Sequence, residues 1–334
     1  MNLKKIFAWL VCIMLGLCLF GCGPDTEPVS SDSESSDSGN LPEAVDHYVG
    51  LTDQKNHRIV VYDMDVEDWT SEAAVVWEYK GPLSHHAAGI KLRYSEFWGG
   101  YVVLTCGPTY AGIIDYATKQ PLWSTTNVPQ NPHSVEVLPD GNFLCAGSTG
   151  NTVRIYAAST KRATCNYSDV TLSSAHGLLW DPSYEVVWML GGSRLEAYTV
   201  EGTSANPTLS RIQNMGGTLP GGAAHDLAPV YGDTNRIWCT GGDGVYQFDK
   251  EENAFTEKYL GRGSLLFTYV PGVGNFPDGS LVCVVPNNCL AEWNTDNVKM
   301  FIPNDAGTRI QSSVTRENKS DAYYKVRVWI SDYQ

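Results

Sequence analysis

Basic residues are scarce in this chain, and they form no cluster beyond the first few positions. The 334 residues include 23 Lys and Arg against 37 Asp and Glu, which gives a formal net charge of -14 at pH 7. Binding to a nucleic acid backbone needs concentrated Lys and Arg, and no such group follows Lys5. The composition therefore excludes nucleic acid as an expected partner.

Several motifs that carry chemistry are also missing. The sequence has no nucleophile elbow, no phosphate-binding loop between a strand and a helix, and no paired metal-binding cysteines. Four of its nine cysteines end apolar segments and are predicted to be small buried core residues: Cys106, Cys145, Cys239 and Cys283. A disulfide between Cys283 and Cys289, across one hairpin, stays open as an alternative.

The long hydrophobic run of this chain lies within residues 1–21. Lys4 and Lys5 precede the run IFAWLVCIMLGLCLF, which is typical of a secretory signal peptide rather than a membrane-spanning helix. The ending Leu-x-Gly-Cys resembles the bacterial lipobox, in which the cysteine is lipidated and becomes the mature N-terminus. This resemblance implies a lipid anchor, with palmitate, at Cys22 on the outer face of the bacterial cell membrane. An ordinary signal peptide that contains Cys22 is the alternative.

Residues 22–45 contain almost no apolar side chains and a run of Ser, Asp and Glu. Such a segment cannot bury enough surface to offset the entropy of ordering, so we predict a flexible stalk. The folded domain is then expected over residues 46–334. We expect it to be a monomer that the lipid at Cys22 alone holds at the membrane.

A short strand-like segment that ends in an aromatic residue recurs six times, with an aliphatic residue three positions before the aromatic. The aromatic residues are Tyr62, Tyr116, Tyr156, Tyr198, Phe248 and Trp293, at intervals of 40 to 54 residues. A period of this length with Gly-rich turns is typical of a β-propeller in which each repeat forms one four-stranded blade. The sequence therefore predicts an all-β, six-bladed propeller.

The two ends of the domain are expected to share one blade. The first repeat has three strand segments but nothing ahead of Asp46 to supply its innermost strand, whereas the stretch from Arg309 contains RIQSSV and YKVRVWI beyond the last repeat. We predict that this stretch completes the first blade and leaves no sheet edge open. Which of its two segments is innermost stays open. The sixth blade is predicted from LLFTYV, SLVCVV and CLAEW.

Four of the seven histidines open the first strand of a blade, where a propeller lines its central channel: His86, His133, His176 and His225. By alignment, Arg262 and Gln311 lie near the two remaining ring positions. One interpretation is that each histidine stabilises its own blade. The other is a site at the channel mouth for a divalent metal ion or an anionic ligand, with Arg262 as the partner of the ligand's charge.

This ring position resembles that of secreted propeller enzymes such as the oligogalacturonate lyases, in which three histidines and a glutamine hold a divalent metal. The resemblance implies that the mouth binds a glycan or another small anionic ligand, with metal-dependent lyase or hydrolase activity on an acidic saccharide. No catalytic base can be matched, so whether the protein is an enzyme stays open. The chain also looks like propeller lipoproteins of bacteria. The alternative function is a non-catalytic binding or scaffold propeller that recognises a protein.

Overall fold

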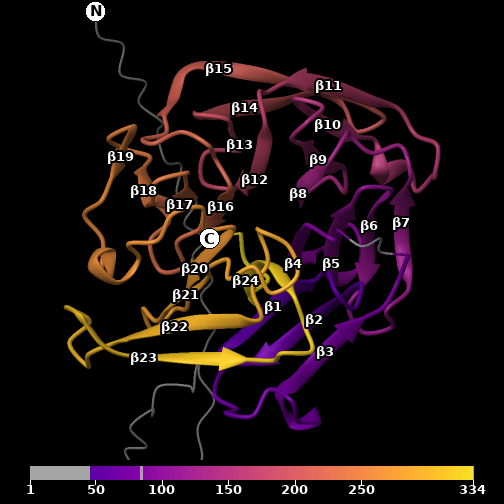
Figure 1. Ribbon diagram of the computed structural model, residues 1–334. Coiled ribbons are helices and arrows are strands. Elements are labelled where there is room, and N and C mark those ends of the chain that lie inside the picture. Colours follow the sequence, from indigo (N-terminus) through magenta and orange to yellow (C-terminus); the bar gives the residue numbers. More distant parts are fainter. Residues whose placement is uncertain (1–45, 83–85, 334) are drawn as a thin grey trace, which may run out of the picture. The chain divides into compact units, whose positions relative to one another are not determined.

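The computed structural model describes residues 46–82 and 86–333, so the predictions for residues 1–45 fall outside this part of the chain. The described residues form six four-stranded sheets that follow one another around a central axis (Figure 1). Within each sheet, neighbouring strands are antiparallel. This arrangement confirms the predicted all-β, six-bladed propeller. No helix among these residues is long and apolar enough to cross a membrane.

Each blade runs from an inner strand beside the axis to an outer strand. Blade one contains, from the axis outwards, β24 (Tyr323–Val328), β1 (Tyr48–Asp53), β2 (Arg58–Asp63) and β3 (Val75–Tyr79). Blade two contains β4 (Gly89–Ser95), β5 (Gly100–Gly107), β6 (Tyr110–Asp115) and β7 (Pro121–Thr125). Blade three contains β8 (Pro132–Val137), β9 (Phe143–Gly147), β10 (Thr152–Tyr156) and β11 (Tyr167–Thr171). Blade four contains β12 (Ala175–Asp181), β13 (Val186–Gly191), β14 (Arg194–Thr203) and β15 (Asn206–Thr218). Blade five contains β16 (Asp226–Pro229), β17 (Arg236–Thr240), β18 (Val245–Asp249) and β19 (Ala254–Thr256). Blade six contains β20 (Gly272–Asn275), β21 (Leu281–Val284), β22 (Asn297–Pro303) and β23 (Ile310–Glu317). Three 3-10 turns, η1 (Glu72–Ala74), η2 (Ala158–Thr160) and η3 (Arg262–Ser264), lie in the connections.

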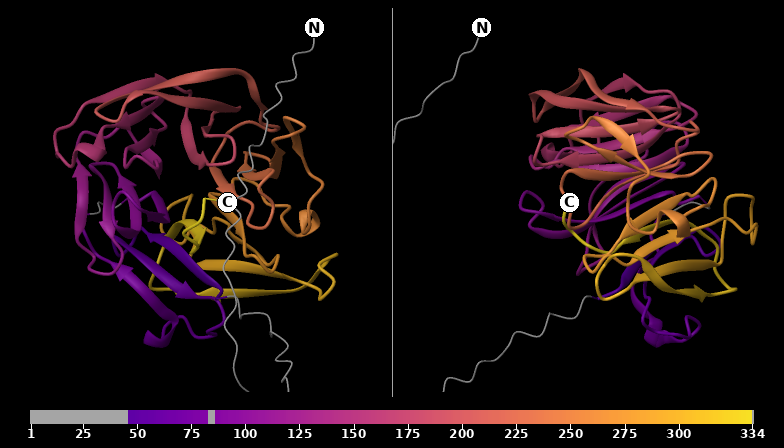
Figure 2. Two further views of the ribbon diagram at one scale, coloured as in Figure 1. Left: turned by 180° about the vertical axis from the view of Figure 1, so that it is seen from behind. Right: turned by 90° about the vertical axis from the view of Figure 1, so that its left-hand side faces the viewer.

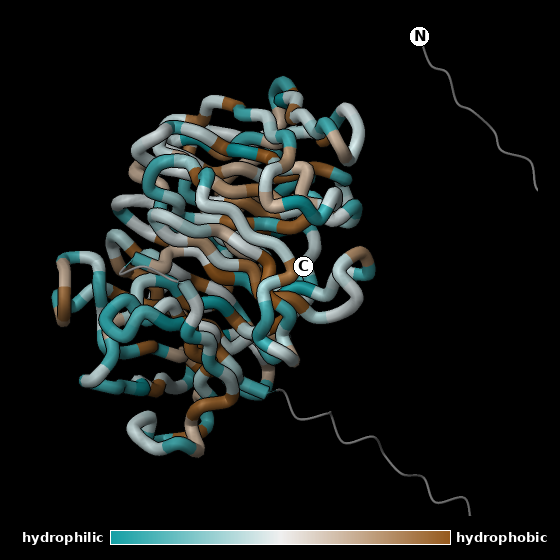
Figure 3. The backbone as a smooth tube through the Cα atoms, turned by 90° about the vertical axis from the view of Figure 1, so that its right-hand side faces the viewer, coloured by the Kyte–Doolittle hydropathy of each residue, from teal (hydrophilic) through white to brown (hydrophobic). Residues whose placement is uncertain are grey.

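The recurring sequence pattern packs each third strand against both neighbouring blades. In β10 the aromatic Tyr156 joins a cluster with Trp123 of blade two, at a ring-centroid distance of 5.4 Å. Val153, three residues earlier, faces the other side of the sheet and packs in a cluster with Leu178 of blade four. Equivalent clusters fill each gap between neighbouring blades. Figure 3 shows most of the apolar segments among the stacked strands.

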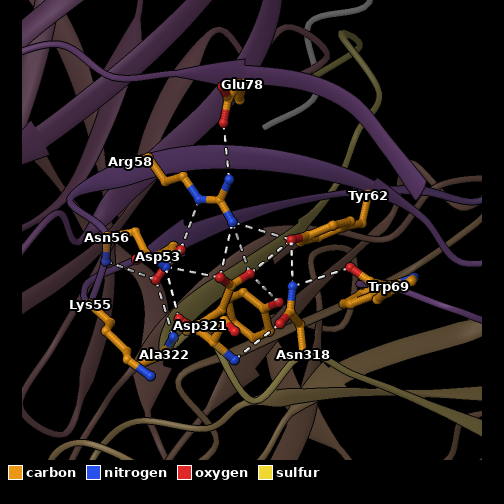
Figure 4. Close-up of polar contacts among 12 residues, drawn as sticks. Asp53, Lys55, Asn56, Arg58, Tyr62, Trp69, Glu78, Asn318, Asp321 and Ala322 are labelled. Atoms are coloured by element: carbon orange, nitrogen blue, oxygen red, sulfur yellow. Dashed lines mark hydrogen bonds and ion pairs between the residues drawn. The ribbon is translucent and has the colours of Figure 1, made fainter. Parts of the chain in front are cut away.

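The C-terminal strand β24 is the inner strand of the first blade, where it pairs with β1. This pairing confirms the predicted closure and shows that YKVRVWI is the innermost segment. The placement of RIQSSV in the first blade is wrong, because this segment forms β23, the outer strand of blade six. A buried polar cluster joins the two chain ends beside this pairing (Figure 4). The Arg58 guanidinium donates to Asp53 at 2.9 Å and to Asp321 at 3.0 Å, and the Tyr62 and Tyr323 hydroxyls donate to Asp321 at 2.8 and 2.7 Å.

The predicted strands of blade six are partly wrong. The segment CLAEW, which ends at Trp293, is a loop, and the third strand of blade six is β22. In β22, Phe301 pairs with Leu281 of the second strand, as the aromatic residue of the third strand does in other blades. LLFTYV is not a strand either, because it follows η3 as an irregular segment and the inner strand begins at Gly272. The loop containing Trp293 folds towards blade one instead, where its indole N–H donates to Gln54 at 2.9 Å.

Four of the six cysteines in the described residues are small core residues. The four predicted core cysteines are fully buried on the second strands of their blades, which confirms their assignment. Cys283 and Cys289 are both free thiols, the first buried and the second exposed, so the structure has no bond between them.

Candidate functional site

The strand registers align one position at the start of the inner strand in all six blades. In each blade, the recurring aliphatic residue of the third strand pairs with a residue of the second strand, which in turn pairs with a residue of the inner strand. The ring position is the residue that precedes this inner-strand residue in the sequence. In chain order this ring position is occupied by Ile90, His133, His176, His225, Pro271 and Tyr324. Three of the four predicted histidines therefore stand at one level of the channel.

These three histidines, called the imidazole stack below, are in contact with one another. The rings of His133 and His176 stack with centroids 4.3 Å apart, and the rings of His176 and His225 are 5.6 Å apart. The Tyr324 hydroxyl lies 2.9 Å from Nδ1 of His133. Nδ1 of His176 lies 2.7 Å from the Ser174 carbonyl, and Nδ1 of His225 lies 3.0 Å from the Ala224 carbonyl.

Burial keeps the imidazole stack uncharged. Burial and the neighbouring charge of Lys325 lower the pKa of His225, and burial together with His176 holds the pKa of His133 well below its ordinary value. Burial lowers the pKa of His176 to about 4, although its bond to the Ser174 carbonyl acts in the opposite direction. The three rings are therefore neutral at neutral pH.

A pocket of about 870 Å³, called the mouth pocket below, opens above this ring. His133, His225 and Tyr324 line its floor, and the connections that precede β20 and β22 supply its walls. Two of the wall residues are unusually exposed aromatics, since Tyr269 is 57% and Trp293 is 44% exposed. The Tyr269 ring lies 5.6 Å from that of His225. Polar wall groups include Gln54, Asn131 and Glu292.

Beneath the mouth pocket, six buried charged side chains from the inner strands, called the channel network below, fill the channel. In one half, Lys91 and Arg93 bind Glu136 at 2.8 and 2.9 Å; in the other, Lys325 and Arg327 bind Asp226 at 3.0 and 2.6 Å. Burial lowers the pKa of both lysines to about 8. Burial opposes the charge of Glu136 and Asp226, but their arginine partners outweigh it and lower the pKa of each carboxyl to about 2.

The far end of the channel is covered by the C-terminal residues after β24. The Arg93 guanidinium donates to the Asp332 carbonyl at 3.1 Å and lies 4.7 Å from the centre of the Tyr333 ring. The Tyr333 hydroxyl in turn donates to the Val137 carbonyl, at the end of β8 opposite His133. Figures 1 and 2 show the C-terminus near the centre of the ring of blades. The mouth pocket is thus the open end of a channel that is closed below.

Comparison with known proteins decides the family. A family of unknown function, DUF6528, matches residues 3–312. The chain belongs to this family. A comparison with curated proteins found no match. Among solved structures, this DUF6528 member is similar to a protein of unknown function from Bacteroides caccae, with 14% identity, a TM-score of 0.54, and coverage of 84% of this chain and 98% of that chain.

Two further solved structures are similar at the same level. A functionally unknown protein from Desulfotomaculum acetoxidans DSM 771 shares 12% identity with a TM-score of 0.54, covering 87% of this chain and 91% of its own. A chain of a nidogen/laminin complex shares 10% identity with a TM-score of 0.54, covering 85% of this chain and 98% of its own. At these identities the likeness concerns the fold alone.

The remaining predicted site residues of this DUF6528 member lie elsewhere. His86 lines the mouth pocket but precedes the ring position of blade two, which Ile90 occupies, and its ring lies 6.2 Å from that of Trp293. Arg262 is in η3, where its Nε donates to Glu257 at 3.0 Å. Gln311 is exposed on the outer strand β23. The ring positions expected near Arg262 and Gln311 belong to Pro271 and Tyr324 instead.

Metal binding by the histidines stays a prediction. Within residues 46–82 and 86–333, no group of three or more His, Cys, Asp or Glu side chains is placed to hold a metal ion. The stacked rings of His133 and His176 lie face to face, and His176 and His225 each use one ring nitrogen on a backbone carbonyl. The imidazole stack therefore offers hydrogen-bonding groups and ring faces to the pocket.

The sequence interpretation missed the channel network and the aromatic wall. Lys91 and Arg93 alternate in GIKLRY, and Lys325 and Arg327 alternate in YKVRVW, within strands whose other residues are mostly apolar. Alternate charged residues in an inner propeller strand point into the channel, and this is the signal that could have revealed the network. Trp293 had been assigned to a strand, which hid its place in the wall.

Proposed function

We propose that this protein binds the end of a carbohydrate chain in the mouth pocket. The observation that carries the proposal is the exposure of Tyr269 and Trp293 beside hydrogen-bonding groups. An aromatic face suits the apolar face of a sugar ring, while exposed side chains such as Asn131 and Glu292 suit its hydroxyl groups. The volume of about 870 Å³ lies within the range of small-molecule sites, roughly 300–1,000 Å³.

The orientation of Trp293 supports a binding surface. Its indole N–H donates to Gln54 of blade one at 2.9 Å, which fixes the ring at the pocket edge. The Gln54 side chain also donates to the Ala87 carbonyl at 3.1 Å and accepts from Asn294 at 3.0 Å. An aromatic residue that is exposed and yet held in place by hydrogen bonds is pre-organised for a ligand, which reduces the entropy lost on binding.

We place this function outside the cytoplasmic membrane, with the protein anchored by a lipid at Cys22. The support is the Leu-x-Gly-Cys sequence that ends at this residue. The polar residues 22–45 would separate the propeller from the membrane surface. A tethered propeller outside the membrane suits the capture of extracellular glycans.

Metal-dependent cleavage of an acidic saccharide is the second candidate. It is favoured by the presence of His133 and His225 on the pocket floor and by the carboxylate of Glu292 on its wall. We rank it below binding because the residues that the structure describes contain no metal-ligand group and no matched base. Release of shorter saccharides in the presence of a divalent metal would move the function to this candidate.

A panel of neutral and acidic oligosaccharides tests the proposal, with affinities measured by calorimetry. Trp293→Ala is expected to weaken binding about tenfold, because it removes a stacking surface. The control is Tyr94→Ala, which removes an aromatic side chain that is 51% exposed but lies on the β4–β5 hairpin outside the pocket. The proposal fails if no saccharide binds the wild-type protein, or if both variants bind as the wild type does.

A further inference from the structure

The hydrogen bonds of the imidazole stack fix where its ring protons lie. A carbonyl oxygen only accepts hydrogen bonds, so the ring nitrogens that contact Ser174 and Ala224 must carry a proton. In a neutral imidazole the second nitrogen then has a free lone pair. Nε2 of His176 and of His225 is therefore an acceptor at neutral pH.

The acceptor of His225 is accessible from the mouth pocket. No hydrogen bond to Nε2 of either histidine is formed within the described part of the chain. His225 lines the mouth pocket, whereas His176 packs against His225 from outside the lining. Among the described lining residues, the carboxylate of Glu292 is a further acceptor on the wall.

The groups around the stack favour the neutral form of its rings. Lys325 donates to the His225 carbonyl and to Asp226, and its charge lies close enough to all three histidines to lower their pKa. Burial raises the pKa of Tyr324, so its hydroxyl beside His133 carries no charge, and the ring of Tyr269 contacts that of His225. Asp226 acts in the opposite direction on His225, but it is shared between Lys325 and Arg327.

The channel network attracts anions from a distance but offers them no contact. Its six side chains are at least nine-tenths buried, with exposures between 0% and 9%. Lys91 and Arg93 donate to Glu136 and to backbone carbonyls, and Lys325 and Arg327 donate to Asp226 in the same way. A carboxylate beside His225 would therefore meet the lone pair of Nε2 rather than an N–H group, and its own oxygens would lose the hydrogen bonds they made to water. None of the described lining residues is a lysine or an arginine that could compensate its charge.

We infer that the floor of the mouth pocket beside His225 is an acceptor surface that selects uncharged, hydroxyl-bearing sugar ends over uronic acids. This inference rests on the proposed function and names the class of sugar that the pocket takes. Hydroxyl groups donate to Nε2 of His225 and to the carboxylate of Glu292, while the ring of the sugar lies against Tyr269 or Trp293. The sequence analysis expected an anionic ligand from the histidines, from Arg262 and from the resemblance to the oligogalacturonate lyases. We propose a neutral ligand instead, because the Ala224 carbonyl sets the direction of the hydrogen bonds of His225.

Matched sugars test the selection. The probes are methyl glucoside with methyl glucuronide and methyl galactoside with methyl galacturonide, titrated at pH 7.5 with detection by saturation-transfer NMR. In the pair that binds, the neutral sugar is expected to bind about tenfold more tightly, since the uronide leaves buried polar groups unpaired. Equal or tighter binding of the uronide overturns the inference but leaves carbohydrate binding intact.

A second measurement does not depend on any sugar. The ¹⁵N chemical shifts of the ring nitrogens report which atom carries the proton, and they are expected to show protonated Nδ1 and bare Nε2 in His176 and His225 at pH 7.5. Charged rings or the opposite tautomer overturn the acceptor floor, whichever sugar binds. If the shifts are as expected but no sugar binds, both the proposed function and the selection are overturned.

A ring replacement separates the acceptor from its surroundings. His225→Phe keeps an aromatic ring and removes Nε2, so the affinity ratio between the neutral sugar and its uronide is expected to fall to about one. The control is Tyr94→Phe, on the β4–β5 hairpin outside the pocket, which is expected to leave the ratio unchanged. An unchanged ratio in His225→Phe overturns the inference.

Discussion

Replacing Asp321 with Asn tests what holds the ring closed. Asp321 lies before β24, its side chain is only 1% exposed, and its two oxygens accept from the Arg58 guanidinium and from the Tyr62 and Tyr323 hydroxyls. An asparagine has nearly the same size but carries no charge and has only one acceptor oxygen. Asp321→Asn therefore leaves the backbone pairing of β24 with β1 possible and removes the polar contacts beside it.

The expected cost follows from burial. Breaking a buried ion pair by removing one partner costs about 3–5 kcal/mol. Arg58 keeps Asp53 at 2.9 Å and Glu78 at 2.9 Å, so its charge stays compensated. The full penalty for an uncompensated charge therefore does not apply, and the loss comes from hydrogen bonds. Whichever way the amide is turned, its NH2 group faces two donors, either those of Arg58 and Asn56 or those of Tyr62 and Tyr323. At about 1–3 kcal/mol for each buried donor left unpaired, we expect Asp321→Asn to lower the free energy of unfolding by about 3 kcal/mol.

Urea denaturation followed by tryptophan fluorescence measures this loss. The matched control is Glu317→Gln, which breaks an ion pair with Lys319 whose side chains are 43% and 71% exposed, and which should cost less than about 1 kcal/mol. A loss below about 1 kcal/mol for Asp321→Asn would refute the reasoning. The ring would then be held by strand pairing and apolar packing alone.

Three further predictions concern the two ends of the domain and the leader. Deleting residues 324–334 removes most of β24 and should leave β1 as an open edge, so we expect aggregation in light scattering; a soluble truncation with a cooperative melting transition would contradict this. His47 binds Asp65 of blade one and Asp278 of blade six at 3.0 Å each, and although burial opposes its charge, these bonds raise its pKa. Charged His47 therefore adds less than about 1 kcal/mol of stability, which is complete below pH 6.5 and is lost as the pH rises through the raised pKa of His47. The melting temperature of His47→Gln should accordingly be lower than that of the wild type at pH 5.5 and converge with it at pH 8.5. Cys22→Ser should release the protein from membranes, and a wild-type protein that takes up no labelled fatty acid would show that the lipobox interpretation is wrong.

Most of the fold could be predicted because the third strand of each blade has the same pattern, an aliphatic residue three positions before an aromatic residue. The prediction failed at CLAEW, which has the same spacing of an aliphatic and an aromatic residue as a third strand but forms the loop that carries Trp293. The deciding contacts are the hydrogen bonds of Trp293 and Asn294 to Gln54, about 240 positions earlier in the chain. Periodicity describes only neighbours in the sequence, so it could not show that this segment belongs to the pocket.

The candidate site could be predicted to the level of three histidines and no further. Counting from the aromatic residues placed His133, His176 and His225 correctly, because their blades have hairpins of similar length. The longer hairpin of blade two shifted the count, so His86 was taken for the ring residue instead of Ile90. Ring stacking and the direction of the hydrogen bonds depend on side-chain positions, which the spacing of residues does not contain.

The pairing of β24 with β1 also sets an order of events during synthesis. A ribosome releases blades two to six before the last residues of the chain, so these blades can pair their strands while blade one still lacks its inner strand. Until β24 emerges, β1 exposes backbone groups that can pair with another chain. The blade that is translated first is therefore the blade that is completed last. From the synthesis of β1 until the synthesis of β24, the nascent chain can pair with another chain along the open edge of β1.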